Sequence, residues 1–448
     1  MKRVFLLVCL FCMTATASFA QEKKSYTLED VIPGGNNYFN LVPKNIPGLQ
    51  WWGDVCVRTD VENIVTINVR NGKETVLVTL DEVNEVLLNG EKPFQPTQEL
   101  KQLRTLMGAS LPWGDQKVIT FRQGNYMVWY DFGQKKISNL FRLNEKAANL
   151  DFCKENGYVA YTVGSNLCIA HEGEKDLQIN PDEKKADPMD IVYGQAVHRN
   201  EFGIYKGTFW SPKGNCLAFY RMDQSMVTAY PQVNTTTRIA TLEPDKYPMA
   251  GMTSHKVTVG VYHIQSGKTV YLQAGDPTDR YFTNISWAPD GKSLYLIELN
   301  REQNHAKLCR YDSKTGELMS TLMEETHTKY VEPQHPILFL PWDHTMFIYQ
   351  SQRDGYNHLY LYNTDGKLIR QLTRGEWLVQ KILGFNAKKR EVIITSTEVS
   401  PLQSNLYKVN VNTGKCTPLD NGKGIHEGIL SASGSYIIDR YSTPDIPR

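Results

Sequence analysis

Short runs of apolar and aromatic residues alternate with polar, glycine-containing turns along residues 51–448. The clearest turns lie at Gly267, Gly316, Gly366 and Gly414, about 50 residues apart. Short strands repeated at such a period are typical of a β-propeller with four-stranded antiparallel blades. The sequence therefore predicts an all-β fold, an eight-bladed propeller, with seven blades as the alternative. Tandem β-sandwiches, the other all-β option, would show no fixed period.

A charged stretch at residues 194–204 precedes the most distinctive hairpin of the chain. Residues 211–215 read Ser-Pro-Lys-Gly-Asn, in which proline fixes φ and glycine tolerates a positive φ, so they predict a tight turn. The flanking runs carry Phe209, Trp210 and Phe219, which suit a packed strand. We expect a β-hairpin that presents the charged stretch as a loop.

Three segments depart from the repeat. Residues 81–107 carry Glu, Leu and Lys at helical spacing, which predicts a helix. Residues 221–256 are predicted to be a long insertion after the hairpin. Residues 21–50, rich in Pro and Gly, are interpreted as an extended N-terminal strap.

The first 20 residues have the features of a secretory signal peptide. Lys2 and Arg3 precede an apolar stretch that is too short to span a bilayer, and small residues at 18 and 20 favour cleavage after Ala20. We therefore expect export to the periplasm, the cell surface or the medium. No later stretch is apolar enough to predict a membrane span.

The formal net charge of +1, without a basic cluster, argues against nucleic acid or an anionic membrane as a partner. The His, Cys and acidic residues show no metal-binding spacing, so we predict no metal and no cofactor. The cysteines beyond the leader lie mostly in apolar runs and are interpreted as buried thiols. Cys153 and Cys168 flank one predicted hairpin and are the one pair considered for a disulfide.

Several segments carry a resemblance to a known family. The Trp-Ser-Pro-Lys-Gly run at 210–214 is common among propellers, whereas residues 352–360 and 371–379 are more specific in their sequence and spacing. Together they resemble the N-terminal propeller of dipeptidyl peptidase IV and its bacterial prolyl-oligopeptidase relatives. The resemblance covers essentially all of residues 25–448. It implies a part in a serine-type dipeptidyl peptidase that acts on peptides with Pro or Ala at the second position.

The resemblance also implies substrate-binding residues. In the family, paired glutamates on a propeller segment bind the free α-amino group of the substrate, and Glu201 matches the second of them. Asn200 stands at the first position, so this chain would have one carboxylate instead of two. Arg122 lies near the place where the family has an arginine that binds a substrate carbonyl. These three residues form the candidate substrate site.

The residues nearby favour structural interpretations. His198 and Arg199 are interpreted as solvated loop residues, with Arg199 beside Glu201, although His198 could titrate near neutral pH. Asp354 is interpreted as part of a blade turn.

Family members continue from the propeller into an α/β-hydrolase domain whose serine lies in a G-x-S-x-G motif. That motif is missing from this sequence, so we identify no catalytic residue and expect the chain to be inactive alone. Three hypotheses stay open: the substrate-gating part of an exported peptidase, a stand-alone binding propeller, and a subunit that assembles with a hydrolase in trans. The expected partners are peptides with a free N-terminus, a hydrolase domain and, in a homodimer, a second copy.

Overall fold

The computed structural model describes residues 25–42, 46–94, 96, 100–173, 176–181 and 187–446. The predicted signal peptide lies outside these residues. Two compact units divide the chain between residues 46 and 47. The first contains two one-turn helices, α2 (Leu28–Val31) and α3 (Tyr38–Leu41), where the sequence predicted an extended strap. The Asp30 carboxylate accepts hydrogen bonds from the Thr27 amide and hydroxyl, which stabilises the start of α2.

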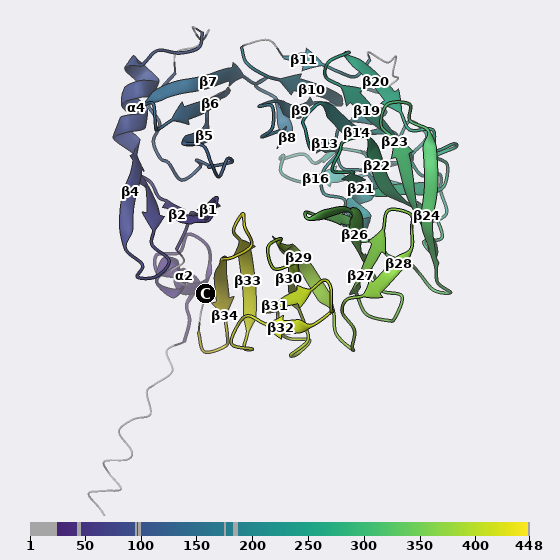
Figure 1. Ribbon diagram of the computed structural model, residues 1–448. Coiled ribbons are helices and arrows are strands. Elements are labelled where there is room, and N and C mark those ends of the chain that lie inside the picture. The colour runs from purple at the N-terminus through teal and green to yellow at the C-terminus, as the bar shows by residue number, and fades with distance from the viewer. Residues whose placement is uncertain are drawn as a thin grey trace, which may run out of the picture. The chain divides into compact units, whose positions relative to one another are not determined.

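The second unit is a seven-bladed β-propeller whose antiparallel sheets follow one another around a ring (Figure 1). The first blade contains β1 (Leu49–Trp52), β2 (Val55–Thr59), β3 (Asn63–Ile67) and β4 (Glu74–Thr79). The second contains β5 (Val118–Gln123), β6 (Tyr126–Asp131) and β7 (Lys136–Arg142). The third contains β8 (Ala148–Phe152), β9 (Val159–Val163), β10 (Asn166–Ala170) and β11 (Leu177–Gln178).

The fourth blade is the widest of the ring, and its short strand β13 pairs with β14 beside β12. Its strands are β12 (Ile191–Tyr193), β13 (Thr208–Trp210), β14 (Cys216–Asp223), β19 (Lys256–His263) and β20 (Lys268–Tyr271). The fifth contains β21 (Arg280–Trp287), β22 (Ser293–Asn300), β23 (His305–Asp312) and β24 (Leu318–Thr326). The sixth contains β25 (Leu338–Leu340), β26 (Asp343–Ser351), β27 (His358–Asn363) and β28 (Leu368–Gln371). The seventh contains β29 (Val379–Asn386), β30 (Glu391–Ser396), β31 (Asn405–Asn410) and β32 (Cys416–Pro418).

The predicted turn glycines occupy equivalent places in four consecutive blades. Each lies in the turn between the last two strands of its blade: Gly267, Gly316, Gly366 and Gly414. Their φ angles are between 65° and 86°. This left-handed conformation is open to glycine without a steric cost. At Gly316 a Cβ would also stand 2.3 Å from the Tyr271 carbonyl oxygen of the neighbouring blade. The period therefore reflects a backbone requirement that is repeated in each of these four blades.

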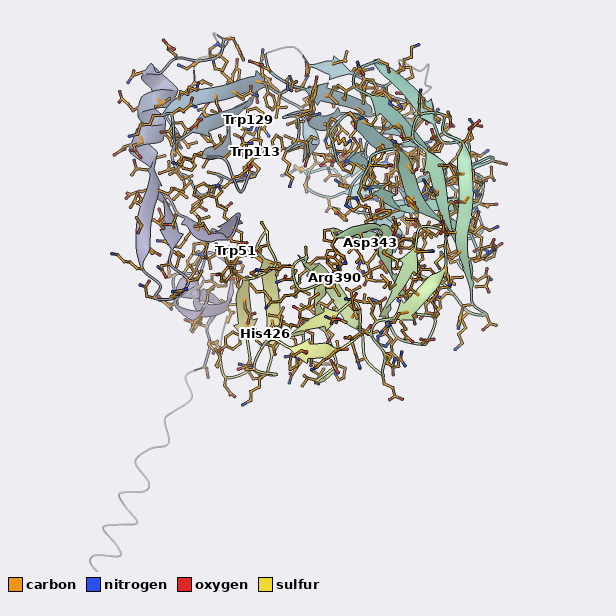
Figure 2. All side chains as sticks on the ribbon, viewed as in Figure 1. Trp51, Trp113, Trp129, Asp343, Arg390 and His426 are labelled. Carbon is orange, nitrogen blue, oxygen red and sulfur yellow. The ribbon has the colours of Figure 1, made fainter. Side chains whose placement is uncertain are left out.

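Aromatic side chains fill the space between adjacent sheets. Trp113 and Trp129 both pack against Phe152, with ring centroids 5.7 and 5.8 Å apart, and so join the second and third blades (Figure 2). Tyr295 and Phe347 contribute in the same way to the buried cluster between the fifth and sixth blades. Because each blade buries apolar surface only against its neighbours, the closed ring is the unit that folds.

A two-stranded sheet closes the ring. Strands β33 (Ile425–Leu430) and β34 (Ile437–Ser442) form this sheet, and a parallel bridge between Ile425 and Ser404 joins it to the seventh blade. The Trp51 indole N–H donates to the Ile429 carbonyl oxygen at 2.8 Å, and the Ala432 amide donates to the Gly53 carbonyl oxygen at 3.1 Å (Figure 2). The alternative of seven blades is therefore confirmed, and the preferred eighth blade is reduced to this hairpin.

The other two predicted departures from the repeat are present, although the helix is shorter than predicted. The helix predicted over 81–107 is limited to α4 (Leu80–Asn89), which Thr79 and Glu82 cap reciprocally at the N-terminus and which stops before Gly90. The insertion within 221–256 forms two small ribbons and no helix among the described residues. The ribbons pair β15 (Ala229–Tyr230) with β18 (Asp245–Lys246), and β16 (Val233–Asn234) with β17 (Thr241–Leu242).

The cysteines of the propeller are free thiols, including Cys153 and Cys168, so the disulfide considered for that pair is wrong. Both are buried, and burial raises the pKa of each thiol to about 11. Over the described residues, no helix is both long and apolar enough to cross a membrane, and no three potential metal ligands gather.

Candidate functional site

The predicted hairpin is present and supports the charged loop. Strands β13 and β14 pair across the turn, in which the Gly214 amide donates to the Ser211 carbonyl oxygen at 2.8 Å. The Ser211 hydroxyl accepts the Cys216 amide at 3.0 Å and so secures the first residue of β14. The charged loop joins this hairpin through Gly203 and Ile204 and packs against β21 of the fifth blade.

The loop has an unusual backbone. Residues His198–Gly203 form a kinked pair of tight turns and no regular helix, since His198, Arg199, Asn200 and Phe202 all have φ between 52° and 64°. Left-handed conformations are unfavourable for most L-residues, so the surrounding structure must impose them. Gly203 continues the run at φ 71°, and a Cβ there would stand 2.0 Å from the Gln334 carbonyl oxygen. The tight approach to residue 334 fixes the end of the loop.

Two buried side chains anchor the loop from below. Phe202 is 2% exposed and packs against Tyr281 with ring centroids 5.0 Å apart. His198 is 3% exposed, which contradicts its interpretation as a solvated residue. Its imidazole packs edge-on against the same tyrosine at 4.9 Å. The anchors lie on either side of the residues that the resemblance assigns to substrate binding.

A second histidine, His255, completes the anchor. The His198 Nε2 atom accepts the Phe282 amide at 3.4 Å, so its proton lies on Nδ1, which donates to His255 Nε2 at 2.9 Å. Burial lowers the pKa of His198 well below its usual value, and the nearby His255 lowers it further. Burial, Arg199 and Arg301 lower the pKa of His255 to about 4. Both imidazoles are therefore neutral at pH 7, so His198 does not titrate near neutrality as the sequence allowed.

Arg199 has specific partners and is not merely solvated. Its guanidinium donates to the Asp245 carboxylate at 2.9 Å and stacks over the Tyr247 ring, 4.7 Å from the centroid. Both members of the ion pair are nearly half exposed. The contact joins the loop to the insertion, and it leaves Glu201 without the arginine expected beside it.

Glu201 lies at the rim of a hollow of about 330 Å³. Its side chain is exposed, and no hydrogen bond or ion pair to its carboxylate occurs among the described residues. The lining includes Tyr247 and Met249 from the insertion, Tyr281 from β21, and Arg301, which is held by Asp279 at 2.5 Å. The hollow thus presents one carboxylate without a protein partner beside aromatic rings, neutral histidines and arginines that are already paired.

The other two candidate residues occupy different places. Asn200 is exposed beside Glu201 but does not line the hollow. Arg122 lies near the end of β5, where its Nε donates to the Gly124 carbonyl oxygen at 2.8 Å. It lines a separate hollow of about 490 Å³ with Lys101 and Arg104. Within the described residues, the hollow at Glu201 therefore contains only one of the three predicted binding residues.

Sequence reasoning missed the part played by the insertion. Asp245, Tyr247 and His255 all contact the loop at residues 198–203, although they follow it by more than 40 positions in the chain. Residues 246–251 did contribute to the family resemblance, and this was the one indication in the sequence that the insertion takes part in the site. Their contact with the loop depends on the return of the chain from β14 through the ribbons to β19.

The contact between Arg199 and Asp245 is expected to contribute little to global stability. Arg199→Met should lower the free energy of unfolding by less than about 1 kcal/mol, because exposed ion pairs are weakened by solvent. Urea denaturation checks this, with Arg370→Met, an exposed arginine of β28, as the matched control. A loss above about 2 kcal/mol would contradict the small contribution expected for an exposed pair.

Comparison with known proteins places the fold in a family. The family model described as "Dipeptidyl peptidase IV (DPP IV) N-terminal region" matches residues 116–448. A probable dipeptidyl-aminopeptidase B from Phaeosphaeria nodorum is 28% identical over 331 residues, covering 66% of this chain and 36% of that protein. Dipeptidyl peptidase 4 from Trichophyton rubrum is 25% identical, with 75% and 45% covered. The chain thus spans less than half the length of these curated relatives.

Two solved structures agree with this assignment. A putative dipeptidyl aminopeptidase IV from Bacteroides ovatus is 50% identical with a TM-score of 0.86, and the match covers 95% of this chain and 60% of that one. Porphyromonas gingivalis dipeptidyl peptidase 4 shares the fold at 22% identity and a TM-score of 0.72, with 94% and 59% covered. The family match and the propeller lead to the same conclusion: this chain belongs to the dipeptidyl peptidase IV N-terminal region family.

Proposed function

We propose that this propeller recognises the free N-terminus of a peptide and thereby gates access to a serine-type dipeptidyl peptidase. The observation that carries the proposal is the free carboxylate of Glu201, held at the rim of a hollow by a loop with buried anchors on both sides. A carboxylate that meets an ammonium group in a partly desolvated site forms a strong charge-assisted hydrogen bond. Acetylation of the peptide removes that charge, so the site discriminates against blocked termini.

The surroundings of Glu201 suit an ammonium group in a second way. Tyr247 and Tyr281 line the same hollow. Aromatic faces attract cations through their quadrupole, and the effect grows where water is excluded. The two arginines of the lining are already paired, Arg199 with Asp245 and Arg301 with Asp279. An incoming ammonium group therefore meets one free anion beside two rings, of which Tyr247 already carries the Arg199 guanidinium over its ring.

The nucleophile belongs to a hydrolase domain in this proposal, since the G-x-S-x-G motif is missing from the sequence. The substrates are peptides with Pro or Ala at the second position, as the family resemblance implies. The propeller contributes selection of the N-terminus, and the hydrolase contributes bond cleavage.

Binding of a dipeptide whose C-terminus is amidated, and therefore uncharged, tests the proposal directly. Calorimetric titration should show that alanyl-proline amide binds at least ~10-fold more tightly than its N-acetylated form, a difference of about 1.4 kcal/mol. Glu201→Gln should remove that preference. Glu376→Gln, an exposed glutamate in the turn between β28 and β29, is the matched control and should keep it. Equal affinity of the unaltered chain for both peptides would refute the proposal.

A further inference from the structure

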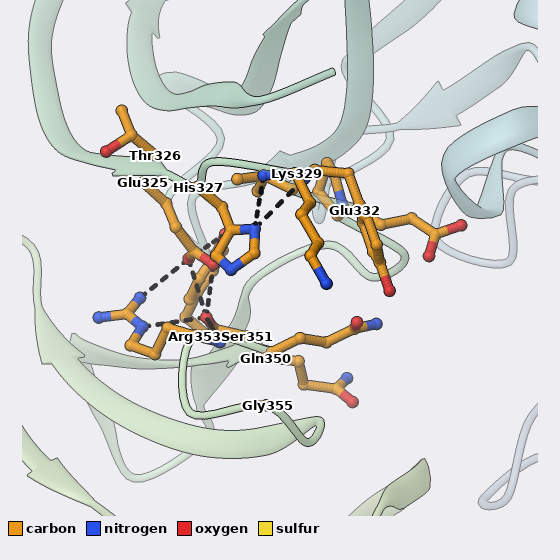
Figure 3. Close-up of a pocket in the computed structure, with 14 residues that line it drawn as sticks. Glu325, Thr326, His327, Lys329, Glu332, Gln350, Ser351, Arg353 and Gly355 are labelled. Carbon is orange, nitrogen blue, oxygen red and sulfur yellow. Dashed lines mark hydrogen bonds and ion pairs between the residues drawn. The ribbon is translucent and has the colours of Figure 1, made fainter. Parts of the chain in front are cut away.

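A second hollow, of about 270 Å³, lies between the fifth and sixth blades. The end of β24, the segment 327–333, the end of β26 and the turn at Gly355 line it (Figure 3). It is separate from the hollow at Glu201, although the two are close in the fold. The Val331 amide beside one donates to the carbonyl oxygen of Gln303, which lines the other, at 2.7 Å.

One acidic group of this hollow is fully engaged. The Glu325 carboxylate accepts the Ser351 hydroxyl at 2.8 Å and the Arg353 guanidinium at 3.2 Å, and its side chain is 12% exposed. Arg353 also donates to the Tyr362 hydroxyl at 2.7 Å and stacks on Tyr360. The two charges neutralise each other in a satisfied network, so neither is available to a ligand.

Three nitrogen donors of the same lining have no acceptor among the described residues. Gln350 is 8% exposed; its amide oxygen accepts from Asn357 at 3.2 Å, whereas its NH₂ group has no partner. Lys329 forms no ion pair. Figure 3 shows Lys329 and Gln350 extending toward the same opening. The Gln350 nitrogen is not among the fully buried atoms that lack a partner, so it is open to water or to a ligand that enters the hollow.

The third donor is the imidazole of His327. Its Nδ1 accepts the backbone amides of Lys329 and Tyr330 at 3.0 and 3.3 Å, so in the neutral ring the proton lies on Nε2. That N–H also lacks an acceptor among the described residues. The lining therefore has a surplus of N–H donors, and its Lys329 ammonium and its Glu332 carboxylate each lack an ion-pair partner among the described residues.

We propose that this hollow binds a carboxylate, carried by the C-terminus or an acidic side chain of a peptide. A carboxylate has two oxygens with about four acceptor positions, enough for an ammonium, an amide and an imidazole donor. Its single negative charge matches the one free cation. Glu332, exposed in the lining, disfavours a dianion such as phosphate by like-charge repulsion. The inference goes beyond N-terminus recognition and does not depend on Glu201.

Probes without an amino group separate this site from the one at Glu201. The full chain is titrated with acetyl-glycyl-glycine, which has a C-terminal carboxylate, and with N-acetylglutamic acid α-amide, whose carboxylate is on the side chain. Acetyl-glycyl-glycinamide is the neutral counterpart, and inorganic phosphate is the competing anion. We expect at least one carboxylate probe to bind ~10-fold or more tightly than the neutral amide. The tighter probe identifies the source of the carboxylate.

Substitutions then assign the binding to the hollow. Lys329→Gln should abolish the difference between acid and amide, and Lys329→Arg should retain most of it. Lys314→Gln, an exposed lysine of the neighbouring turn, is the matched control. An equal affinity for acid and amide would overturn the proposal, as would a Lys329→Gln protein that still prefers the acid. Phosphate binding as tight as the carboxylate would show an unselective anion site and would also overturn it.

Discussion

Glu201→Gln is expected to lower kcat/KM for dipeptidyl substrates with a free amine by ~30-fold to several-thousand-fold in a protein that joins this propeller to an α/β-hydrolase domain. Removing one partner of a desolvated charge pair costs roughly 2–5 kcal/mol, and that cost appears in transition-state binding. Glutamine keeps the size of the side chain but can offer only a neutral acceptor to the substrate ammonium. Hydrolysis of the same substrates with acetylated N-termini should hardly change, because they bring no charge to Glu201.

Two further variants of the loop sharpen this experiment. Arg199→Ala should have a much smaller effect, since Arg199 contacts Asp245 and Tyr247 rather than Glu201. Asn200→Glu should lower KM modestly, because the second carboxylate would stand beside Glu201 although Asn200 itself does not line the hollow. The gain will be partly offset, because Asn200 has φ 64° and asparagine tolerates this conformation better than glutamate. If Glu201→Gln leaves the ratio of free to acetylated substrate unchanged, the loop has no role in amine recognition.

Acidification is expected to destabilise the loop anchor through His198 and His255. The pKa of His255 falls from an ordinary value of 6.5 to about 4 on folding, and burial also holds the pKa of His198 well below 6.5. Below pH 6.5 the unfolded chain binds protons that the folded chain excludes, so stability is fully present above pH 6.5 and is lost as pH falls toward 4. For His255 alone the loss is about 3 kcal/mol between pH 7.5 and 4.

Urea unfolding at a series of pH values measures this effect. His255→Gln should show a shallower loss of stability between pH 6.5 and 5 than the unaltered chain, even if it is less stable at pH 7.5. His344→Gln, which removes an exposed histidine of β26, should follow the unaltered chain. The explanation fails if His255→Gln and the unaltered chain lose stability in parallel over that range.

The local chemistry of the chain was sufficient to predict the repeat and the hairpin. A glycine at positive φ, a proline in a tight turn and an aromatic run between turns each act within a few residues, so Gly316, Pro212 and Trp210 could be interpreted where they stand. The capping box at Thr79 is likewise local, and it places the start of α4 within one residue of the predicted helix. Its early end before Gly90 was not anticipated from helical spacing alone.

Only the tertiary structure decided what surrounds the candidate site. The burial of His198, the pairing of Arg199 with Asp245 and the separation of Arg122 from the hollow at Glu201 all depend on segments distant in the sequence. The number of blades was decided in the same way, because the last hairpin meets Trp51 only when the ring closes. Sequence determines turns and strands through short-range sterics, whereas burial and charge pairing depend on long-range packing between blades.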